Sequence, residues 1–272
     1  HPEIAAVVDE KSMCYLLSSG LSSKTTNPLI TEGRAFLNRV GAPYGQYLLD
    51  DVVAGKTDAK LNVFWGVFAL AREQRVALRA RSERHAAIWC WAPGYIDLDK
   101  GDFSTDAVRE LTGFNVELVK NGNLEVRATP AGIAVGLPAV FGDNTMISPV
   151  LSPNPGPGDV VWANYADGKP AIVLRPGKAP SLFCGTTTVP TVLYRKMADL
   201  AGVHLYTRQD ANVYANGRYL AICATTDGKL KINVGVSGRI WNELESCYQG
   251  CGPTLELNFK KGETKVLRLP LK

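Results

Sequence analysis

Six cysteines are the most obvious candidates for nucleophilic chemistry in this chain. Cys90 stands between Trp89 and Trp91 in the apolar segment "AAIWCWAPG". A cysteine nucleophile on a strand-to-helix turn needs small neighbours, as in Gly-x-Cys-x-Gly, and a base within about 3 Å. His85 precedes the same segment and would lie roughly 15 Å away at about 3.3 Å per strand residue. Cys90 is therefore interpreted as a packing residue.

Cys184 is better placed for chemistry. It ends the apolar segment "SLFC" and is followed by "GTTTVP" and a predicted helix. A helix N-terminus favours negative charge and would lower the pKa of a nearby thiol. His204, the other internal histidine, follows that helix and is expected at the far edge of a sheet. The alternative, which we favour, is an inert cysteine buried at a strand end, as for Cys14, Cys90 and Cys223.

Two pairs of adjacent carboxylates, Asp9-Glu10 and Asp50-Asp51, follow predicted strands. Glycosidases use two carboxyl groups about 5–9 Å apart across the sugar bond. Neighbouring strand residues point to opposite faces, so neither pair meets this requirement by itself. A cross-pair such as Asp9 with Asp51 has no independent support. These carboxylates are interpreted as solvated loop charges, and no catalytic residue is predicted.

The segment "CYQGC" is different, since a turn-rich loop could close Cys247 onto Cys251 as a disulfide. Such a bond would indicate an oxidising compartment. The predicted disulfide favours an extracellular or periplasmic location of the protein over a cytoplasmic one, and the location stays open. No second close pair of Cys or His lies nearby, so no metal site is predicted. The chain begins at His1 without an initiator methionine, which suggests a processed or excised piece.

Charge and composition argue against several classes of protein. The formal net charge is only +4, and basic residues are interleaved with acids, as in "AREQRVALRARSERH". The sequence therefore predicts no nucleic-acid partner. No apolar run approaches the roughly 20 residues that cross a bilayer, so no membrane partner is expected. No GxGxxG, P-loop or HExxH motif is present, and no cofactor is predicted.

Apolar strands alternate with helices in the first part of the chain. Strands are predicted in "EIAAVV", "KLNVFWGVFAL" and "AAIWC", and helices in "NPLITEGRAFLNRV" and "AREQRVALRARSERH". Further along, "SLFC" is predicted as a strand, and "TDAVRELTGF" and "VPTVLYRKMADLAGV" as helices. Uniformly apolar strands separated by helices indicate an α/β fold, a mostly parallel sheet with helices on both faces.

Pairs of turn-forming residues recur through the rest of the sequence. Hairpins are predicted around the following pairs: Asn121-Gly122, Asp167-Gly168, Asn216-Gly217, Asp227-Gly228 and Lys261-Gly262. From about Thr207 the pattern is entirely β. We therefore expect an α/β domain over residues 1–206 and a small antiparallel β domain over residues 207–272.

A ligand site, if there is one, is expected at the carboxyl ends of the parallel strands, where open α/β sheets bind ligands. Trp91 and Tyr95 could stack on a sugar there, although aromatic residues beside a core strand more often belong to the core. The residues that would border this cleft are Trp91, Gly94, Tyr95, Cys184, Gly185 and Thr186.

Several separate segments resemble one known family. They are "VVDEKSMCYLL", "RVGAPYGQYLLDDV", "KLNVFWGVFALAREQRVALRAR", "IWCWAPGYI" and "AGVHLYTRQDANVYANGRYLAI". Together they resemble the trimerisation domain that follows the catalytic barrel in family 42 β-galactosidases. That domain is similar in fold to class I glutamine amidotransferases. The resemblance spans roughly residues 3–225, and the last fifty residues resemble the short β domain that closes such proteins.

The resemblance implies an open, flavodoxin-like sheet without chemistry of its own. It implies a homo-oligomer, with a trimer favoured, whose partner is the catalytic barrel of the parent protein and whose surface helps to shape a carbohydrate site. The barrel needs about 250 residues by itself and is absent from this sequence. Two alternatives stay open. One is a divergent hydrolase with its own cleft at the carboxyl edge of the sheet, using Cys184 or the strand-end carboxylates, and the other is a carbohydrate-binding module.

Overall fold

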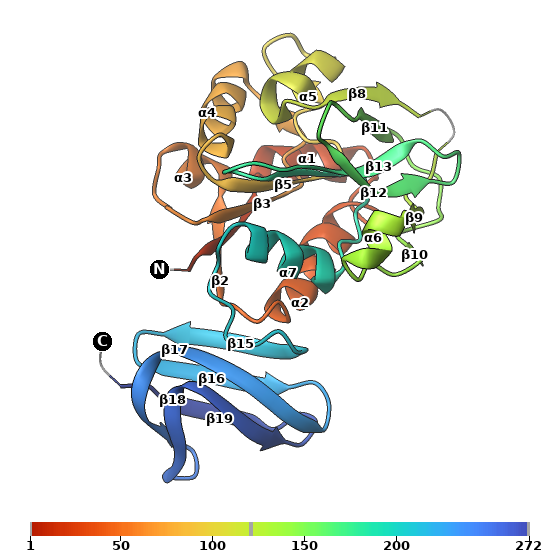
Figure 1. Ribbon diagram of the computed structural model, residues 1–272. Coiled ribbons are helices and arrows are strands. Elements are labelled where there is room, and N and C mark those ends of the chain that lie inside the picture. The colour runs from red at the N-terminus through yellow and green to blue at the C-terminus, as the bar shows by residue number, and fades with distance from the viewer. Residues whose placement is uncertain (1, 120–121, 271–272) are drawn as a thin grey trace.

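The chain forms a larger α/β part and a smaller all-β part, which lies below it in Figure 1. The structure is a computed structural model and describes residues 2–119 and 122–270. One hydrophobic core is built from buried residues between Ile4 and Leu205, and a second from residues between Ala211 and Leu269. Two separate cores support the predicted division near residue 207, which stays a prediction.

The larger part is organised around a nine-stranded sheet with the order β10-β9-β12-β13-β14-β5-β3-β1-β2. Its last five strands run parallel to one another. This order, with the first strand inside the second, is that of a flavodoxin-like sheet. The predicted mostly parallel α/β fold is therefore confirmed. The five parallel strands are β1 (Ile4–Val8), β2 (Tyr44–Leu48), β3 (Leu61–Trp65), β5 (Ala86–Cys90) and β14 (Ser181–Cys184).

Four antiparallel strands extend the sheet beyond β14. They are β13 (Pro170–Arg175), β12 (Val160–Tyr165), β9 (Val126–Ala128) and β10 (Val140–Phe141). The hairpin predicted around Asp167-Gly168 joins β12 to β13 and is confirmed. The hairpin predicted around Asn121-Gly122 is wrong, because β8 (Asn115–Leu118) pairs with β11 (Leu151–Asn154) instead of β9. Asn121 itself lies outside the described residues.

Helices cover both faces of the sheet, with α3, α4 and α5 above it and α2 and α7 below it in Figure 1. The helices are α1 (Glu10–Ser18), a π-helical turn (Asn27–Glu32) that leads into α2 (Gly33–Asn38), α3 (Leu49–Val53), α4 (Arg72–Ser82), α5 (Thr105–Thr112), α6 (Pro130–Ala134) and α7 (Thr191–Leu200). Asp9 is the N-cap of helix α1, and its carboxylate accepts a hydrogen bond from Ser12 N. Cys14 lies exposed on this helix, so its interpretation as a core residue is wrong.

Strand β3 is followed by a small accessory sheet at the carboxyl edge. Its strands are β4 (Ala69–Leu70), β6 (Ile96–Asp97) and β7 (Asp102–Phe103), with β4 and β6 parallel and β6 and β7 antiparallel. The β6–β7 hairpin follows the Ala-Pro-Gly turn after β5, and it places the side chain of Phe103 at the protein surface.

The smaller part is a five-stranded antiparallel sheet with the order β15-β16-β19-β17-β18. The predicted hairpin at Asn216-Gly217 joins β15 to β16 and is confirmed. The hairpin predicted at Asp227-Gly228 is wrong, because β19 lies between β16 and β17, and the one at Lys261-Gly262 is wrong, because β17 lies between β18 and β19. The strands are β15 (Ala211–Asn216), β16 (Tyr219–Ala224), β17 (Gly228–Asn242), β18 (Cys247–Phe259) and β19 (Thr264–Arg268).

The two parts are joined by a segment that is bonded to both of them. Tyr206 N donates to Gly41 O at 2.7 Å, and Asn233 N donates to Tyr206 O at 2.7 Å. An ion pair links Arg39 at the end of α2 to Asp210 just before β15. Gly41 has a φ of 100°, a region that favours glycine.

Within the described part of the chain, no helix is long and apolar enough to cross a membrane.

Candidate functional site

Strand β5 ends in a backbone conformation that is uncommon for a large side chain. Trp91 has a φ of 58° and is 1% exposed. Its indole Nε1 donates to Pro149 O at 3.0 Å, and its ring stacks on Phe68 with centroids 5.0 Å apart. In other α/β proteins a strained residue at the end of a strand, where the strand turns into a helix, can present a nucleophile; here the turn leads into β6 instead. That position carries an indole, which cannot act as a nucleophile.

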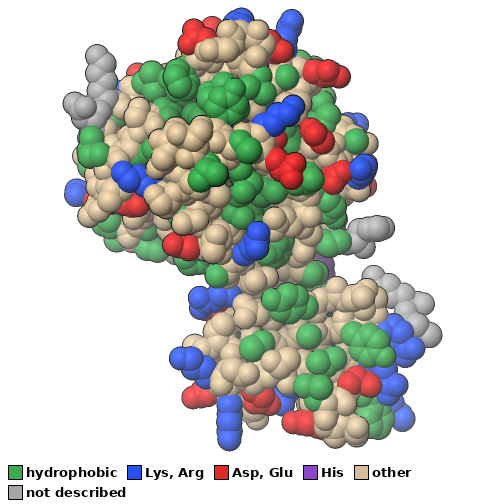
Figure 2. All heavy atoms as spheres, turned by 180° about the vertical axis from the view of Figure 1, so that it is seen from behind, with side chains coloured by type: hydrophobic (Ala, Val, Ile, Leu, Met, Phe, Trp, Pro, Cys, Tyr) green, Lys and Arg blue, Asp and Glu red, His purple; other side chains and the backbone are tan. Residues whose placement is uncertain are grey.

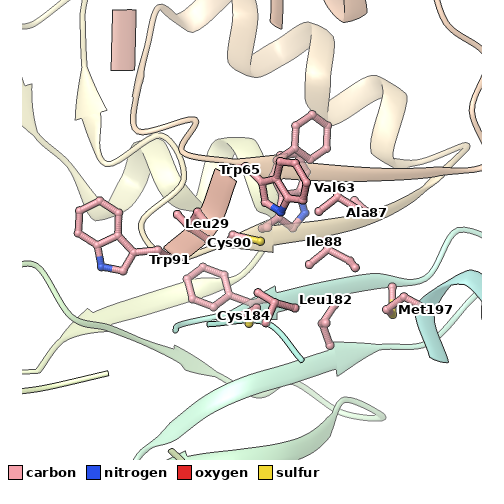
Figure 3. Close-up of a cluster of buried hydrophobic side chains, with 14 of the residues drawn as sticks. Leu29, Val63, Trp65, Ala87, Ile88, Cys90, Trp91, Leu182, Cys184 and Met197 are labelled. Atoms are coloured by element: carbon pink, nitrogen blue, oxygen red, sulfur yellow. The ribbon is translucent and has the colours of Figure 1, made fainter. Parts of the chain in front are cut away.

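The two cysteines nearest this edge are packing residues. Cys90 and Cys184 are paired on neighbouring strands β5 and β14, and both are at most 1% exposed. Figure 3 shows both among hydrophobic side chains. Burial raises the pKa of Cys184 to about 12 and that of Cys90 well above its ordinary value. Burial thus outweighs any lowering by the N-terminus of α7, which agrees with the favoured interpretation of Cys184 as an inert buried residue.

Gly185 and Thr186 follow Cys184 and are enclosed rather than open to a cleft. The Tyr165 hydroxyl lies against Gly185 O at 3.0 Å, where a Cβ on Gly185 would collide with it. Thr186 is fully buried, and its Oγ1 accepts a hydrogen bond from Thr188 N. The Cys184–Thr186 segment is thus separated from the surface.

Gly94 and Tyr95 lie on the other side of Trp91. Gly94 has a φ of 66°, and its Cα faces Leu111 of helix α5, so it serves the turn. Tyr95 packs its ring between Phe68 and Phe103 and lines an open cavity. Of the six predicted site residues, Tyr95 lines this cavity, and Trp91 lies behind its wall. Ligand contact by any of the six stays a prediction.

The cavity beside Tyr95 has a volume of about 460 Å³. It lies between helix α1, the β6–β7 hairpin and the loop before β11. Figure 2 shows hydrophobic side chains gathered on the upper part of the molecule as seen from behind. The lining residues are Tyr15, Ser18, Ser19, Leu21, Phe68, Tyr95, Ile96, Gly101, Asp102, Phe103, Leu118, Ser148 and Pro149.

A buried ion pair fixes the hairpin that carries Tyr95 and Phe103. Arg75 of α4 and Asp97 of β6 are 3% and 4% exposed, with Nη1 and Oδ1 3.3 Å apart. Arg75 Nε also donates to Glu110 at 2.8 Å. The sequence analysis did not single out this pair. The available signal was spacing, since Arg75 lies three residues before the buried Leu78 and so shares the inward face of α4.

The strand-end carboxylates serve local structure. Asp9 is 6% exposed and accepts hydrogen bonds from Ser12 N and Oγ at 2.8 and 2.5 Å, so its interpretation as a solvated charge is wrong. Asp50 accepts from Gln74 Nε2 at 3.1 Å. Asp51 pairs with Lys56 at 2.6 Å. These contacts give each carboxylate a partner other than a second carboxylate.

Cys247 and Cys251 are free thiols on strand β18. The segment between them is strand rather than the predicted loop. Cys251 Sγ lies 3.1 Å from the Tyr248 hydroxyl, and Cys247 Sγ accepts from Gln249 Nε2 at 2.9 Å. The structure does not bring the two sulfur atoms together as a disulfide, and the bond stays a prediction.

Among the residues that the structure describes, no three His, Cys, Asp or Glu side chains gather closely enough to hold a metal ion.

Comparison with solved structures identifies a recurring fold. The chain superposes on β-galactosidase from Bacillus circulans sp. alkalophilus with a TM-score of 0.67 at 14% identity, covering 99% of this chain and 41% of that one. A catalytic mutant of Gan42B, a GH42 β-galactosidase from G. stearothermophilus, gives 0.66 at 13%, covering 99% and 40%. The β-galactosidase of the haloarchaeon Halorubrum lacusprofundi gives 0.63 at 14%, covering 98% and 40%.

These matches confirm the resemblance at the level of the fold. Almost the whole chain, both parts included, has the fold of a portion of these β-galactosidases, and the chain spans about two-fifths of their length. No family model matches the chain, and no curated protein matches it in sequence.

Proposed function

We propose that this chain is a non-catalytic assembly and accessory region of a glycoside-hydrolase-like protein. In this proposal it forms a homo-oligomer, a trimer by analogy with the trimerisation domain that it resembles, and contributes surface to a carbohydrate site that a separate catalytic barrel completes. The observation that carries this proposal is the superposition of almost the whole chain on two-fifths of several GH42 β-galactosidases.

The chemistry of the carboxyl edge supports a role without catalysis. The left-handed position after β5 holds the buried indole of Trp91. The nearby thiols of Cys90 and Cys184 are buried, and their raised pKa values leave almost no thiolate at neutral pH. The alternative of a divergent hydrolase built on Cys184 therefore loses its nucleophile.

Two open sheet edges offer surface for assembly. Strand β2 ends the nine-stranded sheet and β15 ends the five-stranded one. A cavity of about 440 Å³ lies between them and is bordered by Tyr44 and by Tyr214, which is 56% exposed. An unpaired edge with apolar neighbours is a ready surface for another chain.

Light scattering after size exclusion tests the proposal directly. Under reducing conditions we expect a mass near three times the 29.4 kDa of one chain. The Tyr214→Lys variant, which places a charge at the open edges, should shift the mass towards one chain if they form the interface. A Cys251→Ser control excludes oligomers cross-linked through that exposed thiol. A chain that stays monomeric at every concentration would contradict assembly by this region.

A further inference from the structure

Four aromatic rings form a continuous stack from the core to the surface at the carboxyl edge. Trp91 stacks on Phe68 with centroids 5.0 Å apart, Phe68 meets Tyr95 at 6.2 Å, and Tyr95 stacks on Phe103 at 5.2 Å. Exposure rises from 1% at Trp91 to 7% at Tyr95 and 62% at Phe103. We call these four rings the aromatic stack.

Phe103 is the outer ring of the aromatic stack, and it is held in place although it is exposed. Its interplanar angle with Tyr95 is 25°, so one ring face is covered and the rest of the ring remains open to solvent. Backbone pairing of Phe103 with Ile96 fixes the β6–β7 hairpin that carries both rings. A flat apolar surface that is already ordered costs little entropy when a ligand binds to it.

Contacts from helix α4 hold the β6–β7 hairpin in place. The buried Arg75–Asp97 pair fixes β6, and Asp99 Oδ2 accepts a hydrogen bond from Arg72 N at 2.6 Å. Gly101, with a φ of 69°, makes the turn between β6 and β7. The cavity wall is therefore preorganised.

Polar groups surround the apolar surface and retain hydrogen-bonding capacity. The Tyr95 hydroxyl makes no hydrogen bond to another described residue, and burial and the nearby Asp102 charge raise its pKa, so it stays a protonated donor and acceptor at neutral pH. Asp102 Oδ1 accepts from Phe103 N at 2.7 Å, which leaves its other oxygen available. Ser18 and Ser19 donate to backbone carbonyls of α1, so their lone pairs remain free to accept.

The lining also excludes some classes of ligand. None of the described residues that line the cavity is Lys, Arg or His, so an anionic ligand would have no counter-charge beside Asp102. A wholly apolar ligand would cover the Asp102 carboxylate without a partner, which is costly. A quaternary ammonium group prefers aromatic faces on several sides. Here Tyr95 and Phe103 are stacked on each other rather than arranged around a central space.

We propose that this cavity binds a neutral pyranose sugar, a mono- or disaccharide. The C–H face of the ring would lie on Phe103, and its hydroxyls would donate to Asp102 and the serine oxygens and exchange hydrogen bonds with Tyr95. The volume of about 460 Å³ lies within the range of small-molecule sites. This inference goes beyond the proposed function, because it requires neither an oligomer nor a catalytic barrel.

Saturation-transfer NMR on the whole chain tests this site, with methyl β-D-galactopyranoside, lactose and cellobiose as probes and choline as a cationic competitor. We expect saturation of sugar ring protons upon irradiation of the aromatic region. Phe103→Ala should weaken sugar binding about tenfold through loss of the stacking surface, whereas Phe103→Trp should preserve it. Asp102→Asn should also weaken binding, because it replaces a charged acceptor with a neutral amide.

Tyr248→Ala is the matched control, because Tyr248 is an aromatic residue of similar exposure, 51%, in the smaller β sheet. Its sugar binding should equal that of the wild type. The inference is overturned if no sugar shows transfer, if Phe103→Ala binds as tightly as the wild type, or if choline binds in place of the sugars. Because the readout is ligand binding and not mass, this result is independent of the oligomerisation test.

Discussion

Replacing Arg75 by methionine is expected to destabilise the α/β part strongly. The Arg75 and Asp97 side chains are 3% and 4% exposed, so the substitution leaves the Asp97 carboxylate buried without its counter-ion. Breaking a buried pair by removing one partner costs about 3–5 kcal/mol. Arg75 Nη1 also donates to Leu70 O at 2.8 Å, and Glu110 loses a hydrogen-bond donor. Glu110 is one-third exposed and retains access to water, so most of the cost arises at Asp97.

The pH dependence of this loss has a definite sign. Burial alone would raise the pKa of Asp97, but the charge and hydrogen bond of Arg75 and two backbone N–H groups hold it below its usual value. In the wild type this group therefore contributes stability above its unfolded pKa of about 3.9, and that stability is lost as the pH falls through the folded value. In Arg75→Met the buried carboxyl gains a proton more readily, so the difference between the two proteins should shrink below about pH 4.

Urea unfolding followed by tryptophan fluorescence measures this effect. Most of the signal reports the α/β part, since its core contains four of the five tryptophans, Trp65, Trp89, Trp91 and Trp162. Arg109→Met is the control, because Arg109 pairs with Asp106 at the surface, where both side chains are more than half exposed, and it should cost under about 1 kcal/mol.

A loss below about 1 kcal/mol in Arg75→Met would refute the reasoning that Asp97 depends on this guanidinium. The double variant Arg75→Met with Asp97→Asn should recover part of the stability, since it removes the stranded charge. If the double variant is instead less stable than Arg75→Met alone, the loss lies in packing and not in charge.

Two further outcomes follow from burial and backbone geometry. Native Cys90 and Cys184 should resist a thiol reagent at pH 8 while the exposed cysteines react, because burial keeps both in the thiol form; rapid labelling of Cys184, located by mass spectrometry, would contradict this. Gly41→Ala should cost about 1–3 kcal/mol in thermal unfolding, since a Cβ at φ 100° would collide with Thr207 O. Gly55→Ala, at φ 74° with nothing within 4 Å, should cost clearly less, and equal losses would show that the collision is relieved.

Local patterns in the sequence predicted the α/β fold well. Apolar strands separated by amphipathic helices define a parallel sheet almost independently of the rest of the chain. Helix α1 was missed because its residues continue directly from β1, and its start depends on Asp9 accepting a hydrogen bond from Ser12. The hairpins predicted at Asp167-Gly168 and Asn216-Gly217 are confirmed, because in each case the strands on either side of the turn pair with each other. The predictions failed at Asp227-Gly228 and Lys261-Gly262, where pairing is decided by residues far away in the sequence.

The candidate site was harder to predict. Choosing residues at strand ends placed Trp91 and Tyr95 near a real cavity, but it also chose Cys184, Gly185 and Thr186, which the antiparallel strands and the Tyr165 ring enclose. Sequence alone does not show which strand ends are covered. Phe103 was missed because its exposure at the surface cannot be recognised from the sequence. A single phenylalanine after a turn looks like ordinary core, and only its contact with Tyr95 and its exposure distinguish it.

The strand order of the smaller sheet constrains how this part can be made. Strand β19 is the last of the five to leave the ribosome, yet it pairs with β16 on one side and β17 on the other. The β15–β16 and β17–β18 hairpins can each form early from local contacts. Until β19 arrives, facing edges of both hairpins are exposed and unpaired, and an unfinished chain could pair there with a neighbouring nascent chain. The sheet therefore cannot be completed before β19, the strand that joins its two halves, has been made.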